Sequence, residues 1–306
     1  MSGDEPWRGE LRKLMTGEIR FDEAAESHTS IGVGGRIDAL CFPGSEEELA
    51  EVVAFLRARR IPFLPVGNWT NLIVRGGGYR GVLIAMTGLR ALTKSDAGDG
   101  GVRLEVQAGL PLSELVNLSV HEALTGMEFC AGIPGSVGGA VRMNAGAYGG
   151  EIKNICLAVR LLDPDGGIRS VPRTGLDFSY RNLDLPAETI IIGAAFHLRR
   201  GEKEAIAGRI REIIALRHTR HPLEFRNAGS IFKNPPAIPA GKLIEAAGLK
   251  GIRIGDAQVS EKHGNFIVNR GQATAEELLV LIDLVQKRVY AATGHALETE
   301  VRIIGE

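Results

Sequence analysis

The sequence lacks a large net charge, a long apolar run, a cysteine cluster and a Rossmann fingerprint, each of which would point directly to a class of function. Its formal net charge is −1, with 36 lysines and arginines against 37 aspartates and glutamates. This balance gives no overall argument for binding nucleic acid or an anionic membrane surface, although it leaves room for a local basic pocket. No apolar run reaches the length that spans a bilayer, and residues 1–13 are too charged for a signal peptide. We therefore expect neither a membrane nor a nucleic acid as a partner.

Cysteine is scarce and poorly placed for metal binding. The three cysteines are Cys41, Cys130 and Cys156, and no two of them have Cys-x-x-Cys spacing. The seven histidines do not pair with these cysteines at the spacing of zinc ligands. This usage is typical of a reduced cytoplasmic protein with small buried thiols. We expect a cytoplasmic protein that binds no metal.

A Rossmann dinucleotide-binding fingerprint is also absent. That fingerprint needs a strand, then Gly-x-Gly-x-x-Gly, then an acidic residue roughly twenty positions later. Gly132, Gly135 and Gly138 have Gly-x-x-Gly spacing instead, and no other segment has the required order. The sequence therefore excludes a simple doubly wound nucleotide-binding domain.

Glycine is abundant, and it is concentrated in residues 130–151. A backbone without side chains can approach a ligand closely and present bare N–H groups, for which a phosphate-bearing cofactor is the obvious partner. A mobile glycine loop is the alternative. Apolar residues such as Val137, Val141 and Met143 lie between the glycines, whereas flexible linkers are polar. This mixture favours an ordered, buried, phosphate-binding segment.

Hydrophobic periodicity and turn residues predict a mixture of helices and strands, typical of an α+β or mixed α/β protein. Two helices begin with capping boxes, Ser45 with Glu48 and Thr274 with Glu277. Helices are predicted over 8–17, 45–60, 111–123, 202–217, 240–247 and 274–292. Strands are predicted over 37–42, 62–66, 72–74, 81–85, 102–106, 154–162, 168–172, 189–196, 257–259, 265–268 and 297–304.

Two short segments in the first two thirds of the chain suit ligand binding. The polar loop 67–71 lies between two buried strand segments, although an ordinary hairpin has the same pattern. Arg181, which follows Tyr180, is either a surface arginine or an anion contact.

Two more segments with reactive side chains lie near the C-terminus. Ser230 follows Gly229 and is either a helix cap or a proton donor. The segment lacks the Gly-x-Ser-x-Gly pattern, so Ser230 is not the nucleophile of a serine hydrolase. Glu298, Glu300 and Arg302 share one face of the last predicted strand. A row of charges is also what an exposed edge strand carries. None of these segments decides the function alone.

Together, these segments resemble the UDP-N-acetylenolpyruvoylglucosamine reductases of bacterial peptidoglycan synthesis. The motifs follow the family's order from about residue 20 to the end of the chain. The most specific pair is Gly-Ile-Pro-Gly-Ser-Val-Gly-Gly at 132–139 and Gly-Ser-Ile-Phe-Lys-Asn-Pro at 229–235. The others are Ser27-His-Thr-Ser30 with Gly34 and Gly35, the 66–74 loop, Asn144-Ala-Gly-Ala-Tyr148, Tyr180-Arg181, Lys262-His263 with Asn265-Phe266, and Glu300-Val-Arg302.

The resemblance implies an α+β fold. It consists of an FAD-binding fold of the vanillyl-alcohol-oxidase (PCMH) type in two subdomains, followed by a C-terminal α+β substrate domain. By this resemblance, the FAD-binding domain covers 1–200, with subdomains at about 20–90 and 91–200, and the substrate-binding domain covers 201–306. The short interval between Arg181 and Ser230 is similar to that of the family's shorter subclass.

The resemblance also implies non-covalent FAD, because the first loop lacks the histidine or cysteine to which some fold relatives attach flavin. The family loop usually reads Gly-x-Gly-Ser-Asn, so Trp69 stands in place of a glycine, where it either crowds or covers the pyrophosphate. The implied FAD contacts are Gly67, Asn68, Trp69, Thr70, Asn71, Gly132, Ile133, Pro134, Gly135, Ser136, Gly138, Gly139, Asn144, Ala145, Gly146 and Arg302.

In the family's reaction, NADPH is the co-substrate that reduces FAD, and a UDP-linked enolpyruvyl amino sugar then receives the hydride to give UDP-N-acetylmuramate. The charge that develops beside the substrate carboxylate needs hydrogen-bonding or positive partners, and the carbon needs a proton. By resemblance, Arg181 and Glu300 bind and polarise the carboxylate, and Ser230 donates the proton. Glu300 is expected to be protonated, with a raised pKa. The implied substrate contacts are Tyr148, Lys233, Asn234 and Lys262, and Lys233 could also stabilise the alkoxide of Ser230.

Two other functions fit parts of this pattern. Another flavin oxidoreductase of the same fold, such as a sugar or alcohol oxidase, would keep the glycine loops without the set Arg181, Ser230 and Glu300. A protein that binds flavin or a nucleotide sugar without turnover would not need that set either. The presence of all three residues favours the reductase.

Overall fold

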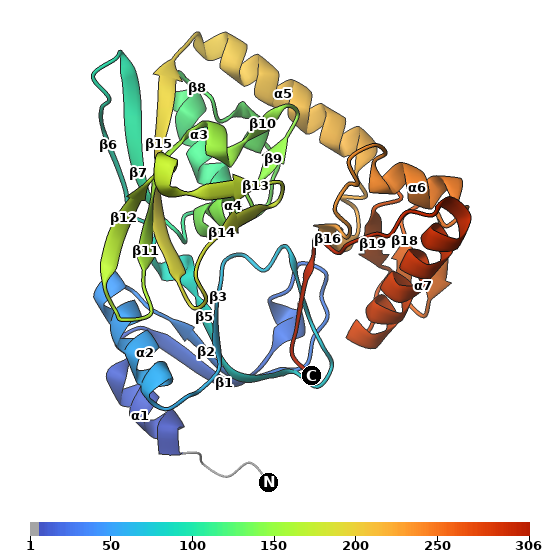
Figure 1. Cartoon of the computed structure of the whole chain (residues 1–306), viewed down its shortest axis with the longest axis horizontal. Coiled ribbons are helices and arrows are strands. Elements are labelled where there is room, and N and C mark those ends of the chain that lie inside the picture. Colours follow the sequence, from blue (N-terminus) through green and yellow to red (C-terminus); the bar gives the residue numbers. More distant parts are fainter. Residues whose placement is uncertain (1–5) are drawn as a thin grey trace. The chain divides into compact units, whose positions relative to one another are not determined.

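The structure is a computed structural model that describes residues 6–306, and its chain divides into two compact units (Figure 1). The first unit contains the segment up to Phe21 with residues 39–68 and 81–215. The second contains residues 22–38, 69–80 and 216–306. Each unit thus joins segments that are far apart in the sequence. The division into functional domains at residue 200 stays a prediction.

The first unit is built on an antiparallel sheet with the strand order β12-β11-β15-β7-β6, and β8 pairs with β15 beside this path. The central strand, β15 (Ile190–Arg200), is buried without interruption from Ile190 to Phe196, as expected of a strand that is covered on both faces. Its neighbours are β11 (Cys156–Leu162) and β7 (Gly101–Gln107). The outer strands are β12 (Ile168–Pro172), β6 (Leu92–Asp96) and β8 (Leu124–Thr125).

Helices and short hairpins complete this unit. The helices are α1 (Pro6–Leu14), α2 (Glu46–Ala58), α3 (Leu112–His121), α4 (Val137–Arg142) and the start of α5 (Lys203–Arg220). One hairpin pairs β9 (Gly146–Ala147) with β10 (Gly150–Glu151), and another pairs β13 (Asp177–Ser179) with β14 (Asn182–Asp184). Strand β6 and helix α4 were not predicted from the sequence.

The capping box predicted for α2 is only half formed. The hydroxyl of Ser45 accepts the N–H of Glu48, as predicted. The carboxylate of Glu48, however, accepts N–H groups of Thr16, Gly17 and Gly44 at 2.6, 2.7 and 2.7 Å. Partial burial raises the pKa of Glu48, and these hydrogen bonds outweigh it, so the net pKa is lowered. Glu48 therefore joins α2 to the segment that follows α1.

A four-stranded sheet has the order β1-β2-β5-β3, with β1 (Glu18–Ala24), β2 (Arg36–Phe42), β3 (Phe63–Val66) and β5 (Tyr79–Ala85). Strands β3 and β5 are parallel. The two strand segments around loop 67–71 do not form the ordinary hairpin that their pattern also allowed, because β4 (Leu72–Val74) pairs in parallel with β20 (Arg302–Ile304) and not with β3. The last strand is also shorter than the predicted range 297–304, since a bend at Val301 precedes it.

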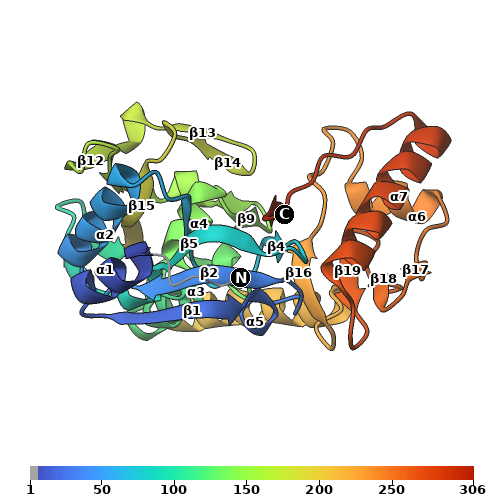
Figure 2. The ribbon, with the colours of Figure 1, turned by 90° about the horizontal axis from the view of Figure 1, so that it is seen from below.

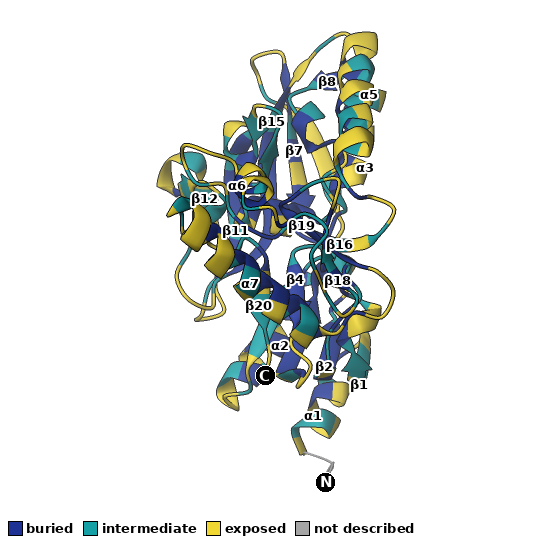
Figure 3. Ribbon diagram, turned by 90° about the vertical axis from the view of Figure 1, so that its right-hand side faces the viewer, coloured by how far each residue is buried: buried dark blue, intermediate teal, exposed yellow. Residues whose placement is uncertain are grey.

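The second unit contains the sheet β16-β19-β18-β17, against which α7 (Ala275–Thr293) packs (Figures 1 and 2). The strands are β16 (Arg226–Ser230), β17 (Arg253–Ile254), β18 (Ala257–Val259) and β19 (Phe266–Asn269), and α6 (Ala240–Ala246) is the second helix. One face of α7 is buried and the other is exposed, as its apolar spacing predicts (Figure 3). The apolar core of this unit also includes Ile31, Val33 and Ile73 from the early segments.

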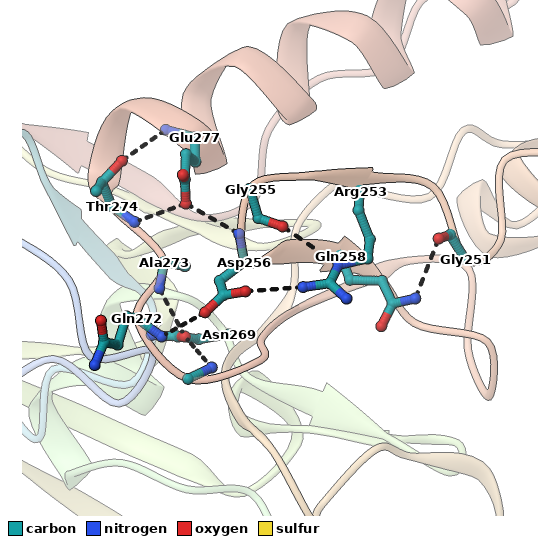
Figure 4. A network of polar contacts seen from close by, with 11 residues as sticks. Gly251, Arg253, Gly255, Asp256, Gln258, Asn269, Gln272, Ala273, Thr274 and Glu277 are labelled. Carbon is teal, nitrogen blue, oxygen red and sulfur yellow. Dashed lines mark hydrogen bonds and ion pairs between the residues drawn. The ribbon is translucent and has the colours of Figure 1, made fainter.

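The capping box predicted at the start of α7 is confirmed, and it extends into a larger polar network (Figure 4). The hydroxyl of Thr274 accepts the N–H of Glu277, and the Glu277 carboxylate accepts the N–H groups of Thr274 and Asp256 at 3.1 and 3.2 Å. Asp256 in turn pairs with Arg253 at 2.8 Å. The network therefore fixes the β17–β18 hairpin against the first turn of α7.

Within residues 6–306, no helix combines the length and the hydrophobicity that crossing a membrane requires. In the same range, no group of three or more His, Cys, Asp or Glu side chains is placed to hold a metal ion.

Candidate active site

The glycine-rich stretch forms a loop, residues 131–136, that leads into α4. Ser136 is the N-cap residue, and its Oγ accepts the N–H of Gly139 at 3.4 Å. The N–H of Gly138 donates to the carbonyl of Ala108 at 2.8 Å. The expectation of bare N–H groups is therefore wrong at the start of α4, where glycine instead allows close packing.

The loop before α4 has the accessible backbone that a phosphate contact needs. Gly132, Pro134 and Gly139 are exposed, so the stretch is not wholly buried as its apolar residues suggested. Gly132 and Gly135 have φ of +70° and +137°, which glycine adopts without strain. A Cβ at Gly139 would meet only the Oγ of Ser136, at 3.6 Å. The residues of this loop therefore fit a contact with the pyrophosphate of FAD, and they do so better than the first residues of α4.

Gly67, at the start of the first predicted FAD loop, lies against the same serine. A Cβ built on Gly67 would lie 2.3 Å from the Oγ of Ser136, closer than real atoms approach. The absent side chain therefore lets residue 67 touch the glycine-rich stretch. The structure brings these two predicted FAD segments together within the first unit.

Trp69 has a left-handed backbone, the conformation that glycine adopts most readily. Its φ is +55°, in the left-handed region that few side chains favour. Its indole is 7% exposed and packs on the ring of His28, with 5.2 Å between the ring centroids. Its carbonyl accepts the N–H of Ser30 at 3.2 Å. The Ser27–Ser30 motif thus supports this loop, a role that its sequence did not reveal.

Asn71 joins the same loop to the end of the chain. Its Nδ2 donates to the carbonyl of Glu300 at 3.1 Å, and its own carbonyl accepts the N–H of Arg302 at 3.1 Å. Burial raises the pKa of Tyr79, and the positive charge of Arg302 partly offsets this increase. A residue predicted to bind FAD and a residue predicted to act on the substrate are therefore neighbours.

Ser230 is the last residue of β16, so the alternative that it caps a helix is wrong. It pairs with Phe266 of β19 after a break in register that follows Asn227. Gly229, in this bulge, has φ of +75°, and its N–H donates to the Oδ1 of Asn227 at 3.0 Å. Bulges redirect side chains and recur beside active sites.

The structure brings Glu300 to the segment that carries Ser230. The N–H of Glu300 donates to the carbonyl of Ile231, the next residue after Ser230, at 2.8 Å. The bend at Val301 interrupts the predicted strand, so Glu300 and Arg302 do not lie in one continuous strand as expected.

Asn265, which is buried, supports the same segment. Its Oδ1 accepts the N–H of Phe232 at 2.9 Å, and its Nδ2 donates to the carbonyl of Phe232 at 2.8 Å. Its own carbonyl accepts the N–H of Ile231 at 2.9 Å. The sequence motif contained Asn265 without indicating this role, because the two segments meet only in the folded sheet.

The predicted substrate contacts in the second unit have protein partners. The Nζ of Lys233 lies 2.5 Å from the Oε1 of Glu298. The Oδ1 of Asn234 accepts the first N–H of α6 at 3.0 Å. The Nζ of Lys262 donates to the carbonyl of His218 at 2.8 Å. These interactions position the three side chains in the structure. Their contacts to substrate stay predictions.

Two histidines pack beneath β19. Burial, reinforced by nearby cations, lowers the pKa of His221 to about 4. Burial also lowers the pKa of His263, whose ring centroid lies 5.6 Å from that of His221. Both rings contact Phe266. They are neutral at pH 7 and act as apolar supports.

Tyr180 and Arg181 form the two-residue turn between β13 and β14. Arg181 has φ of +57°, and its guanidinium lies 5.0 Å from the ring centroid of the exposed Tyr180. Arg181 belongs to the first unit, whereas Ser230 and Glu300 belong to the second. That all three serve one site stays a prediction.

Asn144 and Tyr148 lie after α4 in the first unit. The N–H of Asn144 donates to the carbonyl of Val141 at 3.0 Å, and its side chain is fully engaged within the unit. Tyr148 and Gly149 form the β9–β10 turn with φ of +50° and +87°, the signs of a type I′ hairpin. Direct contacts of Asn144 to FAD and of Tyr148 to substrate stay predictions.

The α+β fold, with Gly67 packed against the glycine-rich stretch at Ser136, fits the class of flavin-binding proteins with a C-terminal extension. Comparisons with known proteins support this class. Residues 37–171 match the family model of an FAD binding domain, and residues 221–304 match the model of the UDP-N-acetylenolpyruvoylglucosamine reductase C-terminal domain. The chain belongs to the UDP-N-acetylenolpyruvoylglucosamine reductase family, which confirms the resemblance seen in the sequence.

Individual relatives agree over nearly the whole chain. The reductase of Syntrophus aciditrophicus is 52% identical over 297 residues, which cover 97% of this chain and 95% of the relative. That of Heliobacterium modesticaldum is 45% identical and covers 97% and 94%. The crystal structure of the Thermus caldophilus reductase has a TM-score of 0.79 at 34% identity and covers 95% of this chain and 100% of its own.

A more distant structure shares the fold alone. An alkyldihydroxyacetonephosphate synthase has a TM-score of 0.50 at 15% identity and covers 65% of this chain and 42% of its own. The expected α+β fold, with an FAD-binding domain of the vanillyl-alcohol-oxidase type, is confirmed.

Proposed function

We propose that this chain reduces UDP-N-acetylglucosamine enolpyruvate to UDP-N-acetylmuramate with NADPH, in the synthesis of peptidoglycan precursors. The observation that carries the proposal is the hydrogen bond from the Glu300 N–H to the Ile231 carbonyl, at 2.8 Å. It joins the segments of two proposed catalytic residues, Ser230 and Glu300. Membership of the reductase family supports the same reaction.

The cofactor of this reaction is FAD, bound without a covalent link. The loop 67–71 and residues 132–139 hold its pyrophosphate, with the backbone of residues 144–146 and the side chain of Arg302 as further contacts. When bound, FAD supplies the hydride carrier between NADPH and the substrate. The exposed, left-handed backbone at Gly132 supports this placement.

Three side chains meet the demands of the substrate. Arg181 pairs with the substrate carboxylate, and protonated Glu300 donates a hydrogen bond to it, which stabilises the charge that develops on the adjacent carbon. Ser230 gives that carbon its proton. Lys233, whose Nζ lies 2.5 Å from the Oε1 of Glu298, is the cation proposed to stabilise the alkoxide of Ser230. Tyr148, Asn234 and Lys262 hold the sugar and the diphosphate.

The partner is the UDP-linked sugar, and we expect neither a nucleic acid nor a membrane as a second partner. The balanced charge, −1 overall, supports the first expectation. We place the protein in the cytoplasm, in line with its scattered cysteines.

A two-step assay tests the proposal. NADPH should bleach the flavin absorbance of the purified protein, and the enolpyruvyl nucleotide should restore it without oxygen. Ser230→Ala should keep the bleaching and slow the recovery. Bleaching without recovery in the wild-type protein would favour a different flavin oxidoreductase, and a colourless protein would contradict flavin binding.

A further inference from the structure

We propose that Asn144 is a positioning residue that fixes the turn carrying Arg181. This inference rests on the proposed function, because that function gives Arg181 its contact with the substrate carboxylate. The contact of Asn144 with FAD stays a prediction, and it would involve the backbone, because the side chain is engaged by Glu151, Lys153 and Ser179.

Asn144 is buried, at 1% exposure, and one of its side-chain hydrogen bonds reaches the strand that leads into the Arg181 turn. Its Nδ2 donates to the carbonyl of Ser179 at 3.0 Å and to the Oε2 of Glu151 at 2.7 Å. Its Oδ1 accepts the N–H of Lys153 at 3.0 Å. Ser179 ends β13 and directly precedes the turn of Tyr180 and Arg181.

A second side chain from the same region holds the other strand of the hairpin. The guanidinium of Arg142, the last residue of α4, donates to the carbonyl of Leu183 in β14 at 3.0 Å. Helix α4 also contacts β14 directly, and the hairpin lies near α4 in Figure 2. Each strand of the hairpin is therefore held by one side chain from the end of α4.

These two interactions matter because the hairpin has little support of its own. Among the described strands, β13 and β14 pair only with each other, and each has three residues. A short two-stranded hairpin is marginally stable alone. The backbone of Asn144 is left-handed, with φ of +38°, a conformation that asparagine tolerates well. Leu183 anchors β14 in the apolar core, and the bond from Asn144 to the Ser179 carbonyl holds the β13 side of the turn. Position 144 therefore suits asparagine, which supplies both the backbone and the carboxamide.

Asn144→Gly in the holoenzyme tests the inference, because glycine keeps the left-handed backbone and removes the carboxamide. We expect an unchanged flavin content, absorbance spectrum and rate of bleaching by NADPH. Recovery by the enolpyruvyl nucleotide should slow by about 100-fold, the effect of roughly 1 Å of misplacement. The double variant with Arg181→Ala should be no slower than Arg181→Ala alone, because both changes remove one interaction.

Two further variants make the test specific. Asn269→Ala removes another buried asparagine, whose side chain makes hydrogen bonds to Ile31, Gly271 and Ala273. It should lower the melting temperature and leave recovery within about twofold of wild type, since its stability effect does not reach Arg181. Arg142→Ala, at an exposed position, should slow recovery by about tenfold, and it serves if Asn144→Gly does not fold.

Each contrary result has a definite meaning. Loss of flavin from Asn144→Gly, wild-type recovery of its holo form, or effects additive with those of Arg181→Ala would overturn the inference. So would wild-type recovery in Arg181→Ala, because the turn would then have nothing to position. If wild-type enzyme itself fails to recover, the proposed function is wrong instead.

Discussion

The side chain of Asn71 donates a hydrogen bond to the backbone carbonyl of Glu300, with 3.1 Å between Nδ2 and oxygen. The return bond from the N–H of Arg302 to the carbonyl of Asn71, also 3.1 Å, closes the pair. These bonds hold the loop predicted to bind FAD against the segment predicted to act on the substrate. A change at Asn71 should therefore affect both.

Asn71→Asp should destabilise the holoprotein more than Asn71→Ala. Alanine loses one hydrogen bond, about 1 kcal/mol. Aspartate places a second acceptor against the Glu300 carbonyl, and this repulsion adds about 1–3 kcal/mol. Urea unfolding of both variants gives the comparison, and equal free energies of unfolding would show that the hydrogen bond is unimportant.

Gly67→Ala should reduce both stability and flavin content. The new Cβ would lie 2.3 Å from the Oγ of Ser136, so either this hydroxyl leaves its place at the N-cap of α4 or one of the two loops moves. Overpacking of this kind costs about 1–3 kcal/mol. The ratio of flavin to protein absorbance measures the first effect and thermal melting the second.

The Ser136→Ala background provides the control for Gly67→Ala. Removing Oγ takes away the closest clash, although the Cβ of Ser136 remains 3.3 Å from the added atom. Gly67→Ala should therefore be milder in this background than in the wild type. An equal loss in both backgrounds would place the strain elsewhere.

Trp69→Gly should be more stable than Trp69→Ala, although both lose the indole that packs on His28. At φ of +55°, alanine keeps left-handed strain of about 1–2 kcal/mol, which glycine avoids. Both variants should be less stable than wild type by about 2–5 kcal/mol, because a large buried ring is removed. Denaturant midpoints decide the order, and a more stable alanine variant would argue against a left-handed residue 69.

Gly255→Ala should destabilise the second unit far more than Gly248→Ala. Both glycines are left-handed, with φ of +53° and +68°, so both substitutions introduce similar backbone strain. A Cβ at Gly255 would lie 1.8 Å from the Oε1 of Glu277, whereas nothing lies within 4 Å of one at Gly248. The difference should be at least about 1 kcal/mol, the value of the α7 cap that Glu277 completes.

Urea unfolding of the two glycine variants at pH 7 measures this difference. If Gly248→Ala were equally harmful, backbone strain alone would explain both results, and the Glu277 network would have no measurable role.

Acidification should destabilise the wild type more than His221→Phe. The pKa of His221 is lowered to about 4 in the folded state, against an ordinary value of 6.5. The unfolded state therefore binds more protons between these values, and stability falls as the pH drops through 6.5 toward 4. Between pH 7.5 and 5, we expect an extra loss of about 1 kcal/mol, after allowance for solvent screening.

Phenylalanine suits this comparison because it keeps a ring beside Phe266, whose centroid lies 4.9 Å from that of His221. Free energies of unfolding at several pH values give the slope for each protein. Parallel slopes would assign the acid sensitivity to other groups, such as His263.

Elements with strong local signals could be predicted from the sequence. Helix α7 has an apolar stripe, and Thr274 with Glu277 marks its start, so pattern and cap agree. The buried run of β15 is recognisable for the same reason. Helix α4 was missed, because its glycines are poor helix formers. It is stabilised by contacts that no local pattern shows, such as the bond from Gly138 to Ala108.

The candidate site likewise has features that the sequence reveals and features that only the fold reveals. Its residue types and their order were enough to identify the family and to name Arg181, Ser230 and Glu300, because each motif is short and contiguous. By itself the sequence therefore determined the family, and it supplied the candidates for the chemistry: a glycine-rich stretch for a phosphate, and an acid, a hydroxyl and a cation that we propose act on the substrate. Residue types and their order are properties of the sequence itself, so they can be recognised without the fold.

Only the tertiary structure decided which of these residues support one another. The pairing of β4 with β20 joins residues 72–74 to 302–304, and the packing of Trp69 on His28 joins two separate motifs. The hydrogen bonds of Asn144 to Ser179 and of Asn71 to Glu300 are equally long-range. Such contacts depend on how distant segments pack, and no local periodicity or spacing in the chain encodes them.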